Sequence, residues 1–531
     1  MSEATTPTAN STAVKGKSSK GLIIGGGVVA LALAGLGGAY AAGVFDGVTG
    51  GGKQPADVIP STSIAYMRVD LNPSAAQKVG AFRLLDKLPD AKAAFTATDP
   101  KRAVFEWMKK DNADLKDIDY TNDIEPWLGD RIGGGLLPAS GSGSEPVPIV
   151  AVEVKDEAKA EEGLKKLEAA AKPAVDKAKS EVEKAAPGTA VSGSSALGGS
   201  EESVRIYTDG YALIVPKDNE QQVRDQLAAG RLAANENFTG DMKALGDEGV
   251  ASAWYDQPAL MQALNTGSTP AAMDELAQMA GRSALGLRFA SDYVEVGTVS
   301  RGVTQPTVPA VAGIGDLPGD TGAVYSFAGG EQLVTQYWPT MLSVLNASGM
   351  SAEDGIKQAE DALGIKLPDD LGTLLGKQFD IVVAKQDFST VNTGVPVQVA
   401  ARLTTDTAKA ETIITQVQSK LAGMVPNAPT RDVPRKVVGD KLIVAADTAY
   451  LDKLASPQGK LSDNQGFQRT VPDPNTQAGV LFVDLDAFES QYLDQVEADQ
   501  REFVQSLQGL GMVNGPVNNG ESKGSLRLSV N

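Results

Sequence analysis

The first residues whose types and spacing could do chemistry lie in GVTGGGKQP, residues 47–55. Gly47, Gly52 and Lys53 have the spacing of a loop that cradles nucleotide phosphates, in which backbone N–H groups hold the anion and a Ser or Thr hydroxyl holds Mg²⁺. Here a glutamine stands in place of that hydroxyl, a proline follows it, and a long apolar run precedes the glycines. The segment therefore favours a glycine-rich tether over residues 46–55 rather than a nucleotide site.

Aspartates at predicted strand ends are the second set of candidates. They are Asp70, Asp256, Asp484 and Asp486. Converging carboxylates would predict a Mg²⁺ or Ca²⁺ site, because both ions prefer oxygen ligands. Helix capping explains the positions better: Asn72 and Asp256 each stand just before a proline-containing helix start, and Asp486 precedes Glu489 by three residues, as in a capping box. We predict no metal-binding, catalytic or cofactor-binding residue.

Composition excludes much chemistry. The 531 residues contain no cysteine and no histidine, which removes disulfides, thiolate nucleophiles, imidazole bases and ordinary zinc sites. The net charge of −19 repels nucleic acid, and an aromatic content of 5% is too low for a base-stacking platform. The acidic surface favours solubility or a cationic partner. We expect a protein that is not an enzyme, needs no cofactor and binds no nucleic acid.

The elements that must position any site begin with an apolar run at residues 21–45. About 20 apolar residues cross a ~30 Å hydrocarbon core, so the run predicts one transmembrane helix with the lipid bilayer as its partner. Three lysines precede the run and Asp46 follows it, which places a disordered tail, residues 1–20, in the cytoplasm and the bulk of the chain outside. A cleaved signal peptide is the alternative, but the run exceeds the ~7–15 apolar residues of such peptides.

Small residues recur every four positions in this run, from Gly26 to Ala42. This pattern lets two membrane helices approach closely. Because Gly and Ala dominate the run, the stripe allows weak self-association through the transmembrane helix without predicting it.

The rest of the chain repeats itself. Five stretches of the first copy are matched in the same order in a second copy, among them PWLGDRIGGGLL by TLLGKQFDIVVA and, last, ALGLRF by GSLRLSV. We expect a tandem duplication with repeat 1 at 56–303, a linker at 304–313 and repeat 2 at 314–531. The first copy carries extra residues near 165–200, which are either a protruding arm for a partner or a tolerated surface insertion.

Each copy alternates short β-branched or aromatic runs with amphipathic helices. In IYTDGYALIV, Asp209-Gly210 separates two apolar runs as a hairpin turn, and hairpins imply antiparallel pairing. Helices such as SAAQKVGAFRLLDKL would cover one face of the sheet. The predicted fold class is α+β: one N-terminal transmembrane helix followed by two tandem related domains of mainly antiparallel sheet with covering helices.

A family resemblance adds to this interpretation. The order of a lysine-flanked apolar run, a glycine-rich tether, PADVIPSTSIAYMRVDLNPSAAQKVGAFRLLDKLP and DIEPWLGDRIGGGLL resembles a family of actinobacterial single-pass membrane proteins classed as a domain of unknown function. The likeness extends over the chain after residue 21. It implies a cell-envelope location and supplies no activity and no catalytic residues. From the residues themselves, Trp127 and Leu128 of PWLGDR should pack in the core, with a turn at Gly129-Asp130.

Two functions from different classes fit these observations. The first is a non-enzymatic binding or scaffold module of the cell membrane, single-pass, with its bulk extracytoplasmic and an envelope protein, wall component or lipid as its partner. The second is a carrier that holds a lipid or other apolar ligand between the two repeats. A carrier needs a large apolar pocket, whereas a scaffold should be packed solid with its unusual surface outside.

Overall fold

The computed structural model describes residues 52–86, 101–102, 105–106, 109, 115–139, 145–170, 203–264, 279–347, 351–389, 395–424, 433–497 and 500–531. The predicted tail 1–20, the apolar run 21–45 and most of the insertion near 165–200 lie outside these ranges. No helix within them combines the length and the apolar composition that crossing a bilayer requires.

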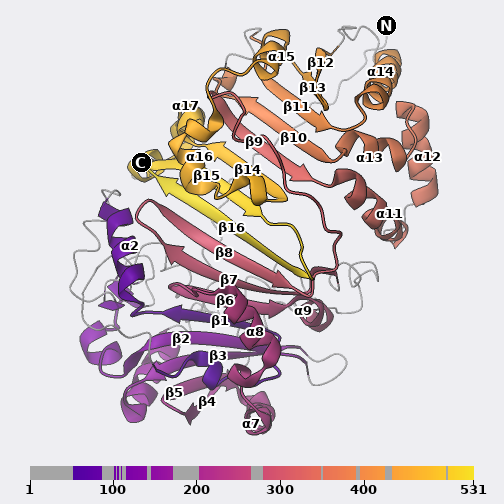
Figure 1. Ribbon diagram of the computed structural model, residues 1–531. Coiled ribbons are helices and arrows are strands. Elements are labelled where there is room, and N and C mark those ends of the chain that lie inside the picture. The colour runs from indigo at the N-terminus through magenta and orange to yellow at the C-terminus, as the bar shows by residue number, and fades with distance from the viewer. Residues whose placement is uncertain are drawn as a thin grey trace, which may run out of the picture.

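One antiparallel sheet of sixteen strands forms the centre of the molecule (Figure 1). The strands of its first half are β1 (Ala65–Asp70), β2 (Leu128–Leu137), β3 (Val147–Val154), β4 (Ser203–Thr208), β5 (Tyr211–Pro216), β6 (Ala251–Asp256), β7 (Arg282–Phe289) and β8 (Tyr293–Arg301). Those of its second half are β9 (Thr321–Ala328), β10 (Gln378–Ala384), β11 (Val399–Thr404), β12 (Arg435–Val438), β13 (Lys441–Ala445), β14 (Gly479–Asp484), β15 (Leu507–Asn514) and β16 (Glu521–Val530).

The two halves share one strand order. From the outer edge to the centre, the first half runs β4-β5-β3-β2-β1-β6-β7-β8 and the second half runs β12-β13-β11-β10-β9-β14-β15-β16. At the centre β8 pairs with β16, from Tyr293 opposite Ser529 to Arg301 opposite Glu521. We call this pairing the seam.

The predicted fold class is therefore wrong in its arrangement. Two separate domains behind a transmembrane helix were expected, whereas the described residues form a single large antiparallel sheet with helices. The physical reason is the seam. A strand at the edge of a sheet has backbone N–H and C=O groups without hydrogen-bond partners. Here the last strands of the two halves, β8 and β16, supply these partners to each other. Residue periodicity locates strands but does not show which edges meet.

Helices from both halves of the chain pack on both faces of the sheet. They are α2 (Ala75–Asp86), α7 (Glu220–Ala229), α8 (Glu236–Leu245), α9 (Gln257–Leu264), α11 (Gly330–Ala347), α12 (Ala352–Leu363), α13 (Asp369–Leu375), α14 (Thr407–Met424), α15 (Thr448–Ala455), α16 (Gln465–Thr470), α17 (Glu489–Tyr492), α18 (Arg501–Gln505) and a helix at 157–170. On one face, α7 and α8 enclose a core with β5 and β6, and α15 and α16 enclose a core with β13 and β14. On the other face, helix 157–170 packs on β3 and β5, and α13 and α14 pack on β11 and β13.

Both halves begin a core helix with the same cap. Asn235 accepts a hydrogen bond from the N–H of Phe238 at the start of α8 (3.1 Å), and Asn464 accepts one from Phe467 at the start of α16 (2.9 Å). Such a cap satisfies a helix N–H that has no partner in the helix. Each phenylalanine then packs edge-to-face on a buried aromatic ring of the sheet. These two contacts fix α8 and α16 over the sheet.

Several local predictions are confirmed. Asp209 and Gly210 form the turn between β4 and β5 with φ of 54° and 82°, the left-handed geometry of a tight hairpin. Trp127 and Leu128 are buried, as expected for PWLGDR. The turn expected at Gly129-Asp130 is wrong, because both residues belong to β2. One match between the copies was placed one strand off, because ALGLRF lies in β7, whose equivalent in the strand order is β15, whereas GSLRLSV lies in β16.

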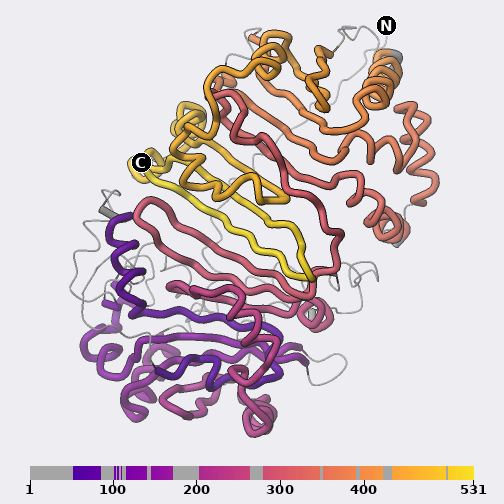
Figure 2. The backbone as a smooth tube through the Cα atoms, in the orientation of Figure 1, coloured from indigo at the N-terminus to yellow at the C-terminus, as the bar shows by residue number. Residues whose placement is uncertain are grey.

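The segment between the halves is extended and attached to the second half. Val303 donates its N–H to Gly520 O (3.0 Å), and Val311 donates to Gln477 O (2.7 Å). The side chain of Val311 is buried in the second core. Figure 2 shows this stretch running past the strand ends from β8 towards β9. The boundaries assigned to the repeats and the linker stay a prediction.

Candidate functional site

The residues of the phosphate-loop spacing do not form a loop around an anion in the part that the structure describes. Gly47 lies outside the described ranges. Lys53 makes an ion pair with Asp209, and its carbonyl oxygen accepts a hydrogen bond from the Tyr211 hydroxyl (2.8 Å). Pro55 is buried against Gly133 of β2. Residues 53–55 therefore lie against the sheet.

Three of the four aspartates end a strand and accept a hydrogen bond from nearby backbone. Asp486 lies beyond the end of β14 and accepts a hydrogen bond from the Asn531 side chain (3.3 Å). Asp256 accepts from the N–H of Ala259 in α9 (3.0 Å), and Asp70 accepts from that of Asn72 (3.0 Å). Asp484 caps the turn after β14, because its carboxylate accepts a hydrogen bond from the N–H of Ala487 (3.1 Å). Within the described ranges, no group of three or more acidic side chains is placed to hold a metal ion.

The carboxyl of Asp486 has a raised pKa. Burial raises the pKa of its carboxyl, the Asn531 amide opposes that shift, and the neighbouring charge of Asp484 adds to it. Asp484 itself is held by Lys385 Nζ (2.7 Å) and by Asn464 Nδ2 (2.8 Å).

The most unusual surface is the face of the central strands that lies opposite α8 and α16. A row of side chains crosses seven strands here, each directly opposite the next, from β7 to β10: Leu287, Val296, Leu526, Met512, Leu481, Tyr325 and Ile381. We call this surface the open face. Leu526, Tyr325 and Ile381 are 41%, 44% and 40% exposed, and the other four are half-buried.

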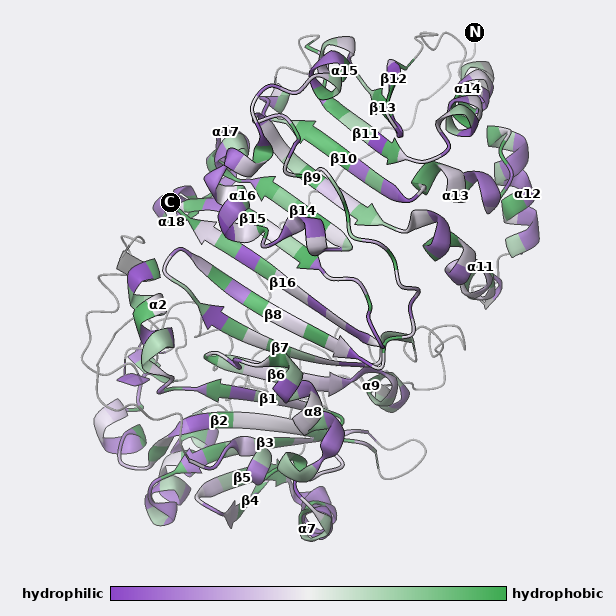
Figure 3. Cartoon of the chain, in the orientation of Figure 1, coloured by the Kyte–Doolittle hydropathy of each residue, from purple (hydrophilic) through white to green (hydrophobic). Residues whose placement is uncertain are grey.

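The rows on either side of this one also carry no charge. From β8 to β10, one neighbouring row holds Val294, Leu528, Leu510, Val483, Ala323 and Val383, and the other holds Thr298, Gly524, Asn514, Gly479, Phe327 and Phe379. Charged residues of the central strands, such as Glu295 and Arg527, point to the opposite face because side chains alternate along a strand. Figure 3 shows this alternation of hydrophobic and hydrophilic residues along β8 and β16.

The size of the open face sets it apart from ordinary exposed leucines. With strands ~4.8 Å apart, the row spans roughly 29 Å, and three rows give an area of about 400 Å². The largest apolar patch on a typical monomeric protein is of about this size, and such a patch often marks an interaction site. The walls at its two ends are helix 157–170 and the pair α13 and α14.

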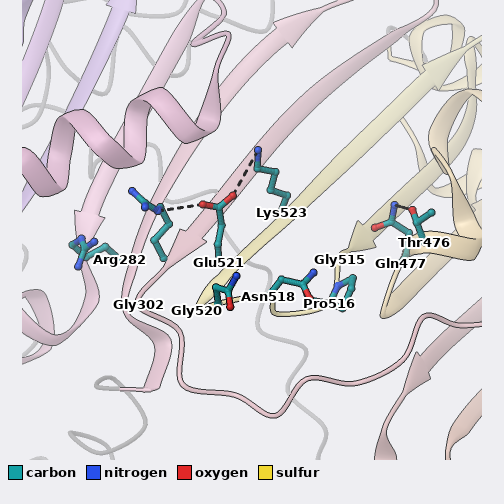
Figure 4. Close-up of a pocket in the computed structure, with 12 residues that line it drawn as sticks. Arg282, Gly302, Thr476, Gln477, Gly515, Pro516, Asn518, Gly520, Glu521 and Lys523 are labelled. Carbon is teal, nitrogen blue, oxygen red and sulfur yellow. Dashed lines mark hydrogen bonds and ion pairs between the residues drawn. The ribbon is translucent and has the colours of Figure 1, made fainter.

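A second candidate is a polar pocket on the helix-covered side of the seam, with a cavity of about 620 Å³. Side chains that line it include Arg282, Arg301, Gln477, Asn518, Glu521 and Lys523. In Figure 4, Glu521 and Lys523 project from β16 into the pocket. Arg282 lies to one side of them and Gln477 lies to the other.

The floor of this pocket is the turn between β15 and β16. Asn518 and Glu521 exchange backbone hydrogen bonds (2.9 and 3.0 Å), which closes a two-residue turn. Asn519 and Gly520 in that turn have φ of 51° and 74°, a geometry that asparagine and glycine adopt most readily. The turn holds Glu521 at the start of β16 opposite Arg301.

A buried carboxylate holds the arginines of the pocket. Asp241 on α8 is fully buried and accepts from Trp254 Nε1 (2.8 Å), Arg282 Nε (2.8 Å) and Arg301 Nη1 (3.4 Å). No sequence motif marks these residues. Arg282 and Arg301 stand at the two ends of the hairpin formed by β7 and β8, where they face each other.

These features define an α+β protein built on one continuous antiparallel sheet, with a polar pocket at its centre and an apolar face that the described residues leave uncovered. Residues 23–423 match the model of a family described as "Protein of unknown function (DUF3352)", and the chain belongs to this family. The expected domain of unknown function is thereby confirmed, although the match ends inside α14 rather than running to the C-terminus.

Other comparisons add little. No curated protein matches the chain significantly. A solved structure described as "Structure of crystal form III of TP0453" is similar at 10% identity, with a TM-score of 0.23 over 49% of this chain and 83% of that one. A likeness at that TM-score supports no conclusion about this chain.

Proposed function

We propose that the chain is a non-enzymatic binding module whose open face docks onto an apolar patch of a protein partner in the cell envelope. The observation that carries the proposal is the uncharged row from Leu287 to Ile381, three of whose side chains are about two-fifths exposed. Burying such a surface against a partner removes apolar area from water, which contributes about 25 cal/mol per Å² before the costs of association.

The openness of this face favours a protein over a single lipid molecule. Small apolar ligands are held in concave sites that bury most of their surface. A protein interface instead has an apolar core and a polar rim, and it needs about 800 Å² on each partner. The three uncharged rows supply such a core. The net charge of −19 favours a partner whose rim is basic.

The extracytoplasmic location belongs to the same proposal. It rests on the sequence, in which Lys15, Lys17 and Lys20 precede the apolar run 21–45 and Asp46 follows it. A reporter enzyme that is active only outside the cytoplasm, fused after Asn531, should be active. Activity of a cytoplasmic reporter at the same position would contradict the location.

Photo-crosslinking in the full chain, expressed in its own host, tests the docking face. A photoreactive amino acid replaces Leu526 or Ile381, and in the control it replaces Gln221, which is exposed on α7. We expect one protein adduct of the same mass from both positions on the open face and none from Gln221. The adduct should disappear when Tyr325→Asp places a charge between the two positions.

Two results would count against this proposal. A lipid adduct from both positions would favour the carrier of an apolar ligand. Adducts of equal yield and mass from Leu526 and from the control position would show that the open face has no preference for a partner.

A further inference from the structure

The pocket at the seam has hydrogen-bond donors that its own carboxylates leave unused. Arg282 donates hydrogen bonds from Nε and Nη2 to Asp241. Arg301 donates one from Nη1 to Asp241, and its Nε forms an ion pair with Glu521 at 3.2 Å. Within the described part of the chain, Nη1 of Arg282 and Nη2 of Arg301 donate no hydrogen bond. A guanidinium carries five N–H donors in a fixed plane, so these nitrogens are oriented before any ligand arrives.

Lys523 adds a third cation at the same place. Its only ion pair in the described residues joins Nζ to Glu521 Oε1 at 3.7 Å, and its side chain is 62% exposed. Glu521 thus lies between Arg301 and Lys523 and is shared by both. Three cations face two carboxylates, which leaves the pocket locally positive on a chain whose net charge is −19.

The repeated fold does not require this cluster. The residue six positions after the cap is Asp241 in α8 but Thr470 in α16. The strand position opposite the last residue of β6 is Arg282, and the one opposite the last residue of β14 is Gly509. The second half therefore builds the same helix-on-sheet packing without the aspartate and without that arginine.

The lining selects a polar ligand. Besides the charged groups, the pocket presents the amides of Gln477 and Asn518 and the hydroxyl of Thr476, and its volume suits a molecule of the size of one or two sugar rings. Hydrocarbon in the pocket would remove water from the charged side chains of Arg301 and Lys523 without replacing its hydrogen bonds, which costs free energy.

We propose that this pocket binds a small polar molecule through an anionic oxygen group, a carboxylate or a phosphate, held by Arg282, Arg301 and Lys523. Two N–H groups of neighbouring guanidiniums and one ammonium form charge-assisted hydrogen bonds with the anion. Asp241 positions both arginines from beneath. Glu521 competes with the ligand for Arg301 and Lys523. The site is independent of the open face, which lies on the other side of the sheet.

Direct binding to the full chain tests the proposal with three probes of similar size: glucuronate, glucose 6-phosphate and glucose. We expect both anions to bind with a dissociation constant that weakens as salt rises, and glucose to bind at least about tenfold more weakly. Preference between the two anions identifies the group, since glucuronate carries a carboxylate and glucose 6-phosphate carries a phosphate. Equal binding of glucose and the anions would overturn the proposal.

Two substitutions should change anion affinity in opposite directions. Lys523→Gln removes a cation from the pocket and should weaken anion binding about five- to tenfold. Glu521→Gln removes the competing carboxylate and should strengthen it. Both side chains are at least one-third exposed, so neither change threatens the fold.

Lys436→Gln is the matched control. Lys436 is also an exposed strand lysine with one carboxylate partner, Asp452 at 3.6 Å, but it lies at the far edge of the sheet on β12. It should leave anion affinity unchanged. If Lys523→Gln and Lys436→Gln weaken binding equally, the anion binds the protein's general charge and the proposed site is wrong. A loss of affinity in Glu521→Gln would also contradict the arrangement.

Discussion

Glu295 on β8 and Arg527 on β16 lie directly opposite each other across the seam, with Arg527 Nε donating to Glu295 Oε2 at 2.7 Å. Arg288 of β7 donates to the other carboxylate oxygen at 2.8 Å. The Arg527 guanidinium also lies over the Tyr293 ring, 4.4 Å from its centroid. One buried carboxylate therefore ties three neighbouring strands together at the junction of the two halves.

Glu295→Gln should destabilise the protein by about 3 kcal/mol, because it leaves two largely buried arginines without a negative partner. Chemical denaturation measures the change. Glu220→Gln is the control, since Glu220 forms an exposed pair with Arg224 within one helix, where the expected loss is below about 0.5 kcal/mol. Equal losses in the two variants would show that the seam does not depend on Glu295.

Helix 157–170 gives a second prediction, about close packing. A Cβ at Gly163 would lie 2.0 Å from Trp127 Nε1 and 2.7 Å from Asp123 O. Trp127 Nε1 donates a hydrogen bond to Asp123 O at 2.5 Å, so the two atoms are held in place. Gly163→Ala should therefore lower the free energy of unfolding by about 1–3 kcal/mol, although alanine favours a helix by about 1 kcal/mol.

The control for this substitution lies in α12. A Cβ at Gly355 would meet no atom within 4 Å, so only the helix preference remains there. Gly355→Ala should raise the free energy of unfolding by about 0.5–1 kcal/mol. The prediction about Gly163 is wrong if both alanine variants are stabilised.

Local features of this architecture could be predicted from the sequence, whereas the pairing between distant strands could not. Local signals succeeded: Asp209-Gly210 forms the expected turn, and Trp127 is buried as expected. The pairing of β8 with β16 could not be predicted, because each strand shows only its own alternation and not its neighbour.

The candidate sites could not be predicted either, because residues far apart in the sequence form them. Leu526 and Ile381 belong to strands with ordinary alternation, and only the strand order reveals that their apolar sides lie in one row and form a common, partly exposed surface. Asp241 lies 41 and 60 residues before the two arginines that it holds, so no spacing motif joins them. Sequence analysis correctly favoured capping for Asp256 because a cap is a local interaction.

Stability should depend on pH through the pair that fastens helix 157–170. Lys166 Nζ donates to Asp123 Oδ1 at 2.5 Å. This hydrogen bond lowers the pKa of the Asp123 carboxyl and raises the pKa of the Lys166 ammonium. A lowered carboxyl pKa contributes stability above the unfolded value of about 3.9, and this is lost as the pH falls through the folded value. A raised ammonium pKa contributes stability below about 10.4, which is lost as the pH rises further.

Asp123→Asn should therefore lower the urea midpoint most between about pH 4 and pH 10, and the difference should shrink progressively at lower and at higher pH. Denaturation of the wild type and the variant at pH 3, 7 and 11 measures the difference. A gap between the two proteins that is as large at pH 3 as at pH 7 would contradict the ionic origin of this contact.

The open face should bind an apolar fluorescent dye, because such dyes gain fluorescence when they leave water for an apolar surface. Leu526→Lys combined with Ile381→Lys places two charges in the row, and dye fluorescence should fall by about half or more. The urea midpoint should hardly change, since both side chains are about two-fifths exposed and a lysine stem can lie along the sheet with its ammonium in water. Val437→Lys with Val438→Lys is the matched control, because these valines are similarly exposed, at 43% and 37%, but lie on the edge strand β12. If this control reduces dye fluorescence as much as the variant in the row does, the dye binds exposed side chains in general and the open face is not a distinct apolar surface.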